Sequence, residues 1–293
     1  YAIPRMLQGM LISIVFISFT ATQSLIVPDH QRSRGFALFG IMGQLGILTS
    51  IVVGEAVYEH WNFIGFYLFT AIIFGSSCIL FLRFPEERYS STNKKAKLSD
   101  LFEVLKHKQV YPIVTWIFIF GCVFGTMITF IPKMVLHTGL NYIRPFYIAF
   151  PISVITTRLT FSHFFDRFPK SIVLIIPLTI LPISLFLVSI MTSNVELLAA
   201  GALYGFCHAT LFPVLLAYLM DYAPAHVHGR MSLLYQFFWS LGIFFASNIG
   251  GIIAEKSIES MFLTAAMFAC SGLLLLIIVL LSKGIARKFH TEK

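Results

Sequence analysis

Two stretches of the chain decide the fold: residues 28–59 read PDHQRSRGFALFGIMGQLGILTSIVVGEAVYE, and residues 224–255 read PAHVHGRMSLLYQFFWSLGIFFASNIGGIIAE. An offset of 196 residues aligns them without gaps. The matched pairs are Pro28 with Pro224, Arg34 with Arg230, Gly46 with Gly242, Gly54 with Gly250 and Glu59 with Glu255, and Gly9 with Gly205 upstream. Apolar residues often match by chance in a chain this hydrophobic, but Gly, Pro and Arg residues rarely coincide at one offset by chance. The chain therefore contains a parallel internal repeat.

The composition excludes a protein that is soluble in water. Of the 293 residues, 57% are hydrophobic and 12% are charged, and the mean hydropathy is +0.84. Soluble domains carry about 25% charged residues. Lipid must therefore cover much of the surface, which excludes a soluble enzyme, a nucleic-acid binder, a disulfide-rich secreted domain and a disordered chain. The four cysteines lie far apart in apolar runs without metal or redox spacing, so we expect no metal and no cofactor.

Apolar runs of about 20 residues are long enough to cross a bilayer as helices. The sequence holds nine of them: Pro4–Val27, Phe36–Tyr58, Asn62–Phe84, Val110–Pro132, Pro145–Phe165, Ile172–Met191, Leu197–Met220, Met231–Ala254 and Met261–Ser282. The positive charges between them are unequally shared. One set of loops and the C-terminal tail hold 16 of the 21 Lys and Arg residues, and the opposite set holds three. This asymmetry predicts that loop 85–109 and the C-terminus are cytoplasmic.

The repeat relates the first three spans to the last three in the same orientation, and it leaves the middle three unmatched. Because residue 1 is Tyr and stands directly before a span, we expect the chain to continue upstream with three more helices. The predicted parts are a remnant of an N-terminal bundle at 1–84, a cytoplasmic linker with a short amphipathic helix at 85–109, and a six-helix bundle with its tail at 110–293. Transporters are often built from such repeats, with the substrate site between them.

Three motifs carry a resemblance to the major facilitator superfamily. Residues 5–9, RMLQG, resemble the R-x-x-Q-G signature of the family's fourth helix, and the glycines after Arg34 resemble its glycine-rich fifth helix. Residues 158–170, RLTFSHFFDRFPK, resemble the G-x-x-x-D-R-x-G-R-R loop in its second copy. Ser162 and Pro169 stand where glycines are usual in that loop. The resemblance covers essentially the whole chain.

This resemblance implies helices four to twelve of an all-α transporter of a small organic solute that works by alternating access. Efflux members are the most similar, which implies a monomer in a bacterial inner membrane, with a proton or another ion as the coupling partner and no nucleic acid. The alternatives are an uptake symporter for a sugar, metabolite or metal chelate, and a transport-dead membrane sensor. An enzyme would need a catalytic pair or metal cluster at span depth, and the sequence has neither H-E-x-x-H nor G-x-S-x-G.

Polar side chains within spans are the candidates for the substrate cavity, because such side chains avoid hydrocarbon. The candidate set is Arg5, Gln8, Gln44, Tyr204, His208 and Gln236. Arg5 is the strongest of these, although an arginine that snorkels to the interface is an alternative. A lone histidine such as His208 is more often a packing residue than a proton carrier, and amides such as Gln236 can also join helices.

A second set of residues is predicted to form a cytoplasmic gate: Arg34, Arg158, Asp166, Arg167, Asp221 and Arg230. In the family's pattern the loop aspartate, here Asp166, faces the start of a helix in the opposite half. That helix begins near Arg34, and a helix N-terminus attracts a carboxylate. Asp221 is expected to pair with Arg167 or Arg230. The alternative is ordinary loop charges in water, where exposed pairs contribute about 0–1 kcal/mol.

Overall fold

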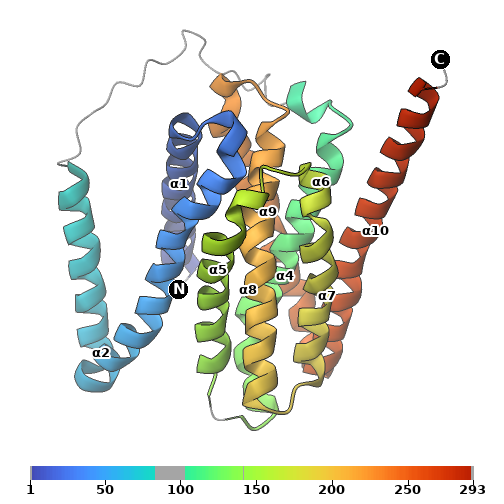
Figure 1. Cartoon of the computed structure of the whole chain (residues 1–293). Coiled ribbons are helices and arrows are strands. Elements are labelled where there is room, and N and C mark those ends of the chain that lie inside the picture. The colour runs from blue at the N-terminus through green and yellow to red at the C-terminus, as the bar shows by residue number, and fades with distance from the viewer. Residues whose placement is uncertain (1, 83–102, 141, 292–293) are drawn as a thin grey trace.

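The structure of the protein is a computed structural model that describes residues 2–82, 103–140 and 142–291, with side chains left out at 2–6, 25, 52, 55, 81, 225 and 283–291. All of the regular elements in these residues are helices (Figure 1). They are α1 (Ala2–Ile26), η1 (Asp29–Gln31), α2 (Arg32–Leu82), α4 (Val110–His137), α5 (Arg144–Phe161), η2 (Ser162–Phe164), α6 (Lys170–Val173), α7 (Ile175–Ile190), α8 (Asn194–Met220), η3 (Ala225–Val227), α9 (His228–Lys256) and α10 (Ile258–Thr291). Most of the predicted amphipathic helix falls at 83–102, outside the described residues.

Eight helical segments in the described residues are long and apolar enough to cross a membrane. Eight of the nine predicted spans correspond to them, with two inside α2, which changes direction at Asn62. The ninth, Pro145–Phe165, is also helical, as α5, but it is not among the eight. Its 18 residues include Arg144, Arg158 and three threonines, which lower its hydropathy. α5 therefore falls below this hydropathy measure, although it runs beside α8 within the bundle (Figure 1).

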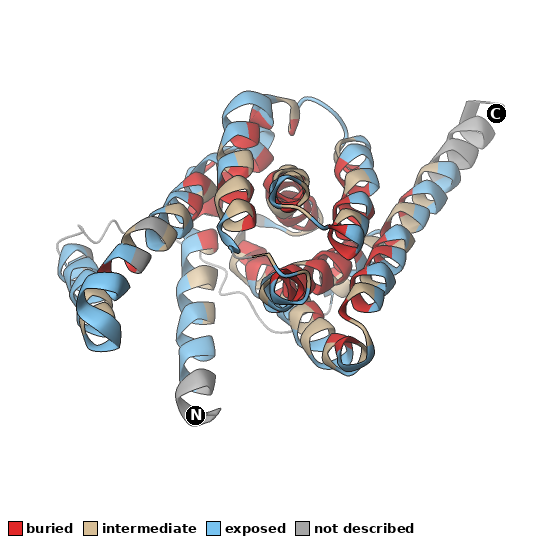
Figure 2. Ribbon diagram, turned by 90° about the horizontal axis from the view of Figure 1, so that it is seen from below, coloured by how far each residue is buried: buried red, intermediate tan, exposed pale blue. Residues whose placement is uncertain are grey.

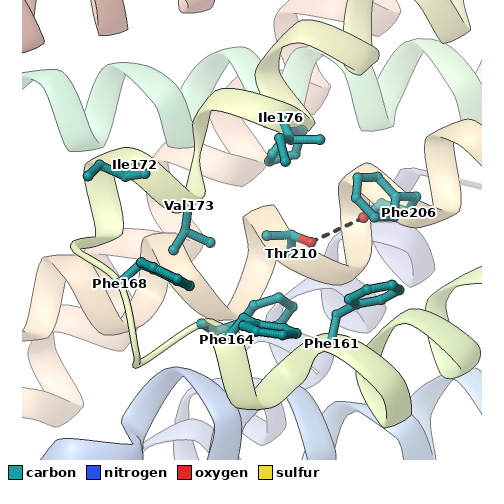
Figure 3. Close-up of a pocket in the computed structure, with 10 residues that line it drawn as sticks. Phe161, Phe164, Phe168, Ile172, Val173, Ile176, Phe206 and Thr210 are labelled. Carbon is teal, nitrogen blue, oxygen red and sulfur yellow. Dashed lines mark hydrogen bonds between the residues drawn. The ribbon is translucent and has the colours of Figure 1, made fainter.

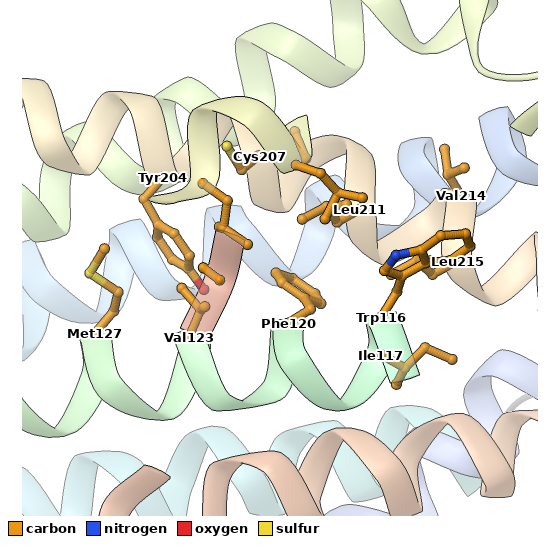
Figure 4. Packing of buried hydrophobic residues seen from close by; sticks show 14 of the residues in the cluster. Trp116, Ile117, Phe120, Val123, Met127, Tyr204, Cys207, Leu211, Val214 and Leu215 are labelled. Carbon is orange, nitrogen blue, oxygen red and sulfur yellow. The ribbon is translucent and has the colours of Figure 1, made fainter. Parts of the chain in front are cut away.

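Helices α4, α5, α7, α8, α9 and α10 form a bundle around a shared apolar core. α5 packs on α8, α4 packs on α9, and α10 packs on both α7 and α4. Figure 4 shows the centre of this core, where Trp116 and Phe120 of α4 face Leu211 and Leu215 of α8. The indole N–H of Trp116 donates to the carbonyl oxygen of Gly272 at 2.9 Å, so this buried polar group is satisfied. Figure 2 shows the buried residues gathered where these helices face one another.

The repeat found in the sequence recurs in the positions of the helix boundaries. The 3₁₀ turns η1 and η3 are 196 residues apart at both ends, and so are the first residues of α2 and α9. The break inside α2 at Asn62, which has a φ of 56°, lies 196 residues before the start of α10 at Ile258. Asparagine tolerates a positive φ better than most residues. The offset that aligns glycines and prolines therefore also aligns the helix starts and the break.

Helices α1 and α2 meet the bundle mainly at one end. This is the basic end, defined here as the end where Arg32, Arg34, Arg167, Lys170 and Arg230 lie at or between helix termini. The buried side chains of α1 and of the first third of α2 cluster there, while the earlier part of α1 is largely exposed (Figure 2). Beyond that contact α2 diverges from α5 (Figure 1). The two groups of helices thus touch at the basic end and separate away from it.

Candidate functional site

Asp166 links the two groups of helices at the basic end. It follows η2 in the loop after α5, and its two carboxylate oxygens accept hydrogen bonds from the first backbone N–H groups of α2. Oδ1 accepts from the amide of Ser33 at 3.0 Å, and Oδ2 accepts from the amide of Arg34 at 2.8 Å. These amides have no partner within their own helix, and the helix dipole adds positive charge there. The loop motif placed Asp166 against this helix start, and the contact joins segments 133 residues apart.

A cluster of ion pairs lies beside the contact of Asp166 with the start of α2, which we call the Asp166 cap. Asp221, at the end of α8, is 2.7 Å from Nζ of Lys170 and 3.6 Å from Nη1 of Arg32. Arg32 also pairs with Asp29, one turn earlier, and its side chain is only 5% exposed. The expectation that Asp221 would pair with Arg167 or Arg230 missed both of these cations. Because Arg32 belongs to α2 and Asp221 to α8, this pair also crosses between the two groups of helices.

The remaining predicted gate residues are dispersed around this cap. Arg34 contributes its backbone amide, and its side chain is exposed. Arg167 is exposed in the loop next to Asp166, and Arg230 is partly buried in the first turn of α9. Arg158 lies deeper, in the last turn of α5 and eight residues before Asp166. It belongs to a different group of side chains.

We expect neutralising Asp221 to have a small effect. The side chain of Asp221 is 36% exposed, and pairs at such sites contribute about 0–1 kcal/mol because water screens them. The Asp221→Asn variant should therefore retain transport within about threefold of the wild type, since 1.4 kcal/mol corresponds to tenfold. Initial solute flux in proteoliposomes measures this. A loss larger than tenfold would show that the ion pairs of Asp221 contribute far more to closing the basic end than exposed pairs usually do.

Arg158, Tyr204, His208 and Tyr235 form a buried group that we call the polar cluster. Their exposures are 1%, 1%, 6% and 0%. Each has a polar atom without a hydrogen-bond partner among the described residues: Arg158 Nη1, Tyr204 OH, His208 Nδ1 and Tyr235 OH. The ring of His208 lies 6.1 Å from that of Tyr204 and 5.9 Å from that of Phe212, and Phe212 contacts Tyr235 at 5.3 Å. Unsatisfied buried polar atoms are costly, so four together indicate a site built for something other than packing.

Aromatic rings enclose the polar cluster. The ring of His208 lies 5.3 Å from that of Phe120 and 5.3 Å from that of Phe150, and it stacks on Phe212 at 5.9 Å. Phe212 continues the contact to Phe16 of α1 at 5.8 Å. Tyr204 and His208 therefore face α4 and α5 inside the bundle, and Phe212 connects their surroundings to the other group of helices.

Arg158 approaches α2 at Gly40. Its Nε donates to the carbonyl oxygen of Ala209 at 3.4 Å, and its Nη1 occupies the space that a side chain at position 40 would need. Gly40 therefore admits the guanidinium group to the contact between α2 and the bundle. Glycines allow helices to approach closely, and here a glycine makes room for a charge.

The Gly40→Ala variant should displace Arg158 and reduce transport severalfold. A Cβ at position 40 would overlap Nη1, so the guanidinium group must move or α2 must shift. Gly43→Ala on the same helix is the matched control, because no described heavy atom lies within 4 Å of a Cβ there. Flux in proteoliposomes should fall in the first variant and stay near wild type in the second. Equal flux in the two variants would contradict a role for this contact.

The other predicted cavity residues are only partly brought together. Arg5 lies in α1, but its side chain is outside the described residues. Gln8 is exposed on α1, one face of which is open. Gln44 is buried one turn beyond Gly40, and its Oε1 has no partner in the part of the chain that the structure describes. Gln236 donates to the Ser240 hydroxyl at 3.0 Å, so it bonds within its own helix.

Sequence reasoning missed Tyr235 and Trp239, which lie one turn apart on α9. Tyr235 is fully buried beside Arg158, and the half-buried Trp239 packs on Phe124 at 4.8 Å. The indole N–H of Trp239 also lacks a partner among the described residues. Both residues stand in an aromatic run, residues 235–239, that gives no reason to choose one ring over another. Their spacing of four would have placed them on one helix face.

A separate cavity of about 440 Å³ opens near the basic end of the bundle (Figure 3). Its lining is almost wholly apolar: Phe161, Phe164, Phe165, Phe168, Ile172, Val173, Ile176, Pro177, Phe206 and Thr210. The Thr210 hydroxyl is occupied, since it donates to the carbonyl oxygen of Phe206 at 3.3 Å. With this lining, the cavity suits a hydrocarbon chain better than a polar solute.

Comparisons with known proteins place this geometry in one family. The family model described as Major Facilitator Superfamily matches residues 1–247 and 146–292. No curated protein matches the chain. Among solved structures, the human organic anion transporter MFSD10 (TETRAN) is similar with a TM-score of 0.70 at 14% identity, over 88% of this chain and 66% of that one. FucP in the outward conformation gives a TM-score of 0.68 at 10% identity, over 90% and 72%.

A further structure, of the E. coli fucose:proton symporter FucP, gives a TM-score of 0.66 at 11% identity, over 90% of this chain and 73% of that one. At these identities the similarity concerns the fold alone. The chain spans about two thirds to three quarters of the length of these transporters. The family match covers nearly every residue, and the helices, their repeat and the contact of Asp166 agree with it. The chain belongs to the major facilitator superfamily.

Proposed function

We propose that the protein is a secondary active transporter that exports a small organic solute by alternating access. The observation that supports this most directly is the arrangement of its contacts. Charged contacts join the start of α2 to the bundle at the basic end, and the polar cluster lies deeper along the helices. A transporter of this kind must break such contacts on one side of the membrane to open its site there.

The proposed orientation puts the basic end in the cytoplasm of a bacterium, with the protein as a monomer in the inner membrane. The excess of Lys and Arg in the loops of that end supports this orientation. Asp166 and the cluster around Asp221 would then form a cytoplasmic gate whose contacts hold that side closed. One of the similar transporters is named a fucose:proton symporter, and coupling to a proton or another ion is part of the proposal.

A reversible cross-link at the gate tests alternating access directly. In a variant lacking Cys78, Cys122, Cys207 and Cys270, cysteines would replace Arg34 and Arg167 of the full-length transporter. These positions flank the contact of Asp166 with the start of α2. Oxidation should stop the flux of a panel of anionic, neutral and cationic dyes in proteoliposomes, and reduction should restore it. The two single-cysteine variants are the controls, and their flux should not respond to oxidation.

Three outcomes would separate the alternatives. If no solute of the panel moves faster than in protein-free liposomes, the chain is a membrane sensor or scaffold of this fold and the transport proposal fails. If flux survives the cross-link, the gate lies elsewhere. The direction of transport is measured as solute accumulation against its gradient, under imposed pH gradients of each sign. Net movement toward the cytoplasmic face would mean that the protein is an uptake symporter and not an exporter.

A further inference from the structure

We propose that Arg158 is the counter-charge for an anionic group of the transported solute, so that the solute is an organic carboxylate with a flat apolar part. This inference rests on the proposed transport function and adds the class of substrate. A buried cation is costly unless it is paired. The Arg158 side chain is 1% exposed, and among the described residues no carboxylate pairs with it. A charge at such depth usually marks the path of a ligand or an ion.

The hydrogen bonds of Arg158 leave its charge uncompensated. Its one bond to a described group runs from Nε to the carbonyl oxygen of Ala209 at 3.4 Å, a long bond to a neutral acceptor. Nη1 has no partner in the described part of the chain. A guanidinium group presents its N–H groups as a planar fork that matches the two oxygens of a carboxylate. An incoming carboxylate would therefore satisfy both the charge and the free donors.

Other unpaired polar atoms in and beside the polar cluster can also donate. The Tyr204 and Tyr235 hydroxyls can donate, the Trp239 indole N–H can only donate, and none has a partner among the described residues. A site that offers a cation and several unpaired donors favours an acceptor-rich anion over a cation. The aromatic rings around His208 and Trp239, at centroid distances of 4.8–6.2 Å, supply flat apolar walls for the rest of the molecule.

The position of Arg158 suits a substrate contact that both groups of helices share. Gly40 brings α2 against the guanidinium group, so an anion at Nη1 would lie where α2 meets α5. The competing interpretation is that Arg158 is a clamp that holds α5 to the α8 backbone through Ala209. A clamp would affect folding but would give the protein no preference for one ligand charge over another. Charge preference is therefore the deciding measurement.

The test uses three probes of one shape: 2-naphthoate, 2-naphthamide and 2-naphthylmethylammonium. Their binding to the purified full-length transporter is measured by isothermal titration calorimetry, which requires no transport. We expect the wild type to bind naphthoate at least about tenfold more tightly than either of the other probes. In Arg158→Gln the naphthoate affinity should fall about tenfold, while the naphthamide affinity changes less than about threefold. Arg158→Lys should keep part of the preference, because it keeps the charge without the fork.

Lys256→Gln is the control, since it removes an exposed cation at the far end of α9 and should leave all three affinities unchanged. If Arg158→Gln does not fold, Arg158→Lys carries the test through its reduced preference for naphthoate. Equal wild-type affinity for naphthoate and naphthamide, or a naphthoate preference that survives in Arg158→Gln, would overturn the inference. Dye flux without any anion preference would also overturn it while the transport function stands. Anion preference in binding without flux of any solute would support this site and reject transport.

Discussion

The Asp166→Asn variant is expected to transport about tenfold more slowly than the wild type without unfolding. Both oxygens of the carboxylate accept backbone hydrogen bonds from the start of α2. An asparagine amide can accept only one of them, and its NH₂ group would face the other N–H. Hydrogen bonds to a charged group contribute about 1.5–3 kcal/mol, and each 1.4 kcal/mol changes an equilibrium tenfold. The closed basic end should therefore lose roughly one order of magnitude in population.

Two measurements and one control check this expectation. Initial flux in proteoliposomes reports the transport rate, and the melting temperature in detergent reports folding, which should change little because the bundle core does not contain Asp166. Glu255→Gln is the matched control, since it neutralises an exposed acid on α9. Flux of Asp166→Asn at the wild-type rate would reject the gate. A large drop in melting temperature would mean that the contact holds the fold rather than the cycle.

The difference expected between Asp166 and Asp221 follows from the partners of each carboxylate. Asp166 binds the fixed backbone of a helix start in the opposite group, so its partner loses no side-chain freedom. Asp221 shares its charge with Lys170 and Arg32, whose long side chains lose rotamer freedom in the pair. Geometry therefore ranks two acids that look alike in the sequence. The cap is expected to dominate and the ion pairs to support it.

The sequence predicted the parts of this structure that depend on period and spacing. The 196-residue offset anticipated that the helix starts of the two copies correspond, because Gly, Pro and Arg stand at turns and caps. The starts are Arg32 and His228, a few residues before the predicted Phe36 and Met231. The loop motif anticipated the partner of Asp166. The sequence could not identify Lys170 and Arg32 as the ion-pair partners of Asp221. Several cations lie near the same end, and only the three-dimensional distances show which of them pair with Asp221.

The polar cluster was only half predictable, for a different reason. Arg158 and His208 stood out as ionisable residues in spans, but Tyr235 did not, because a tyrosine among phenylalanines carries no signal of its own. What joins them is tertiary: Arg158 comes from α5, His208 from α8 and Tyr235 from α9. Periodicity assigns a residue to a helix face, and the packing of three helices then decides which faces meet.

The Gly242→Ala variant is expected to destabilise the protein by about 1–3 kcal/mol, the usual cost of overpacking. Gly242 of α9 lies directly against the backbone of α4. A Cβ there would overlap the carbonyl oxygen of Phe118 and would lie 2.7 Å from the amide nitrogen of Cys122. Backbone atoms cannot turn aside as a flexible side chain can. The whole of α4 would have to move away from α9.

The control variant, Gly251→Ala, is expected to change the stability in the opposite direction or not at all. Gly251 lies on the same helix, and no described heavy atom comes within 4 Å of a Cβ at that position. In an exposed helix, alanine is favoured over glycine by about 0.5–1 kcal/mol, so Gly251→Ala should be neutral or slightly stabilising. The apparent melting temperature in detergent, followed by loss of the monomeric peak in size-exclusion chromatography, compares the two variants. If Gly242→Ala melts at or above Gly251→Ala, then α4 and α9 do not pack backbone to backbone. In that case α9 would also not be the fixed support on which Tyr235 and Trp239 reach the polar cluster.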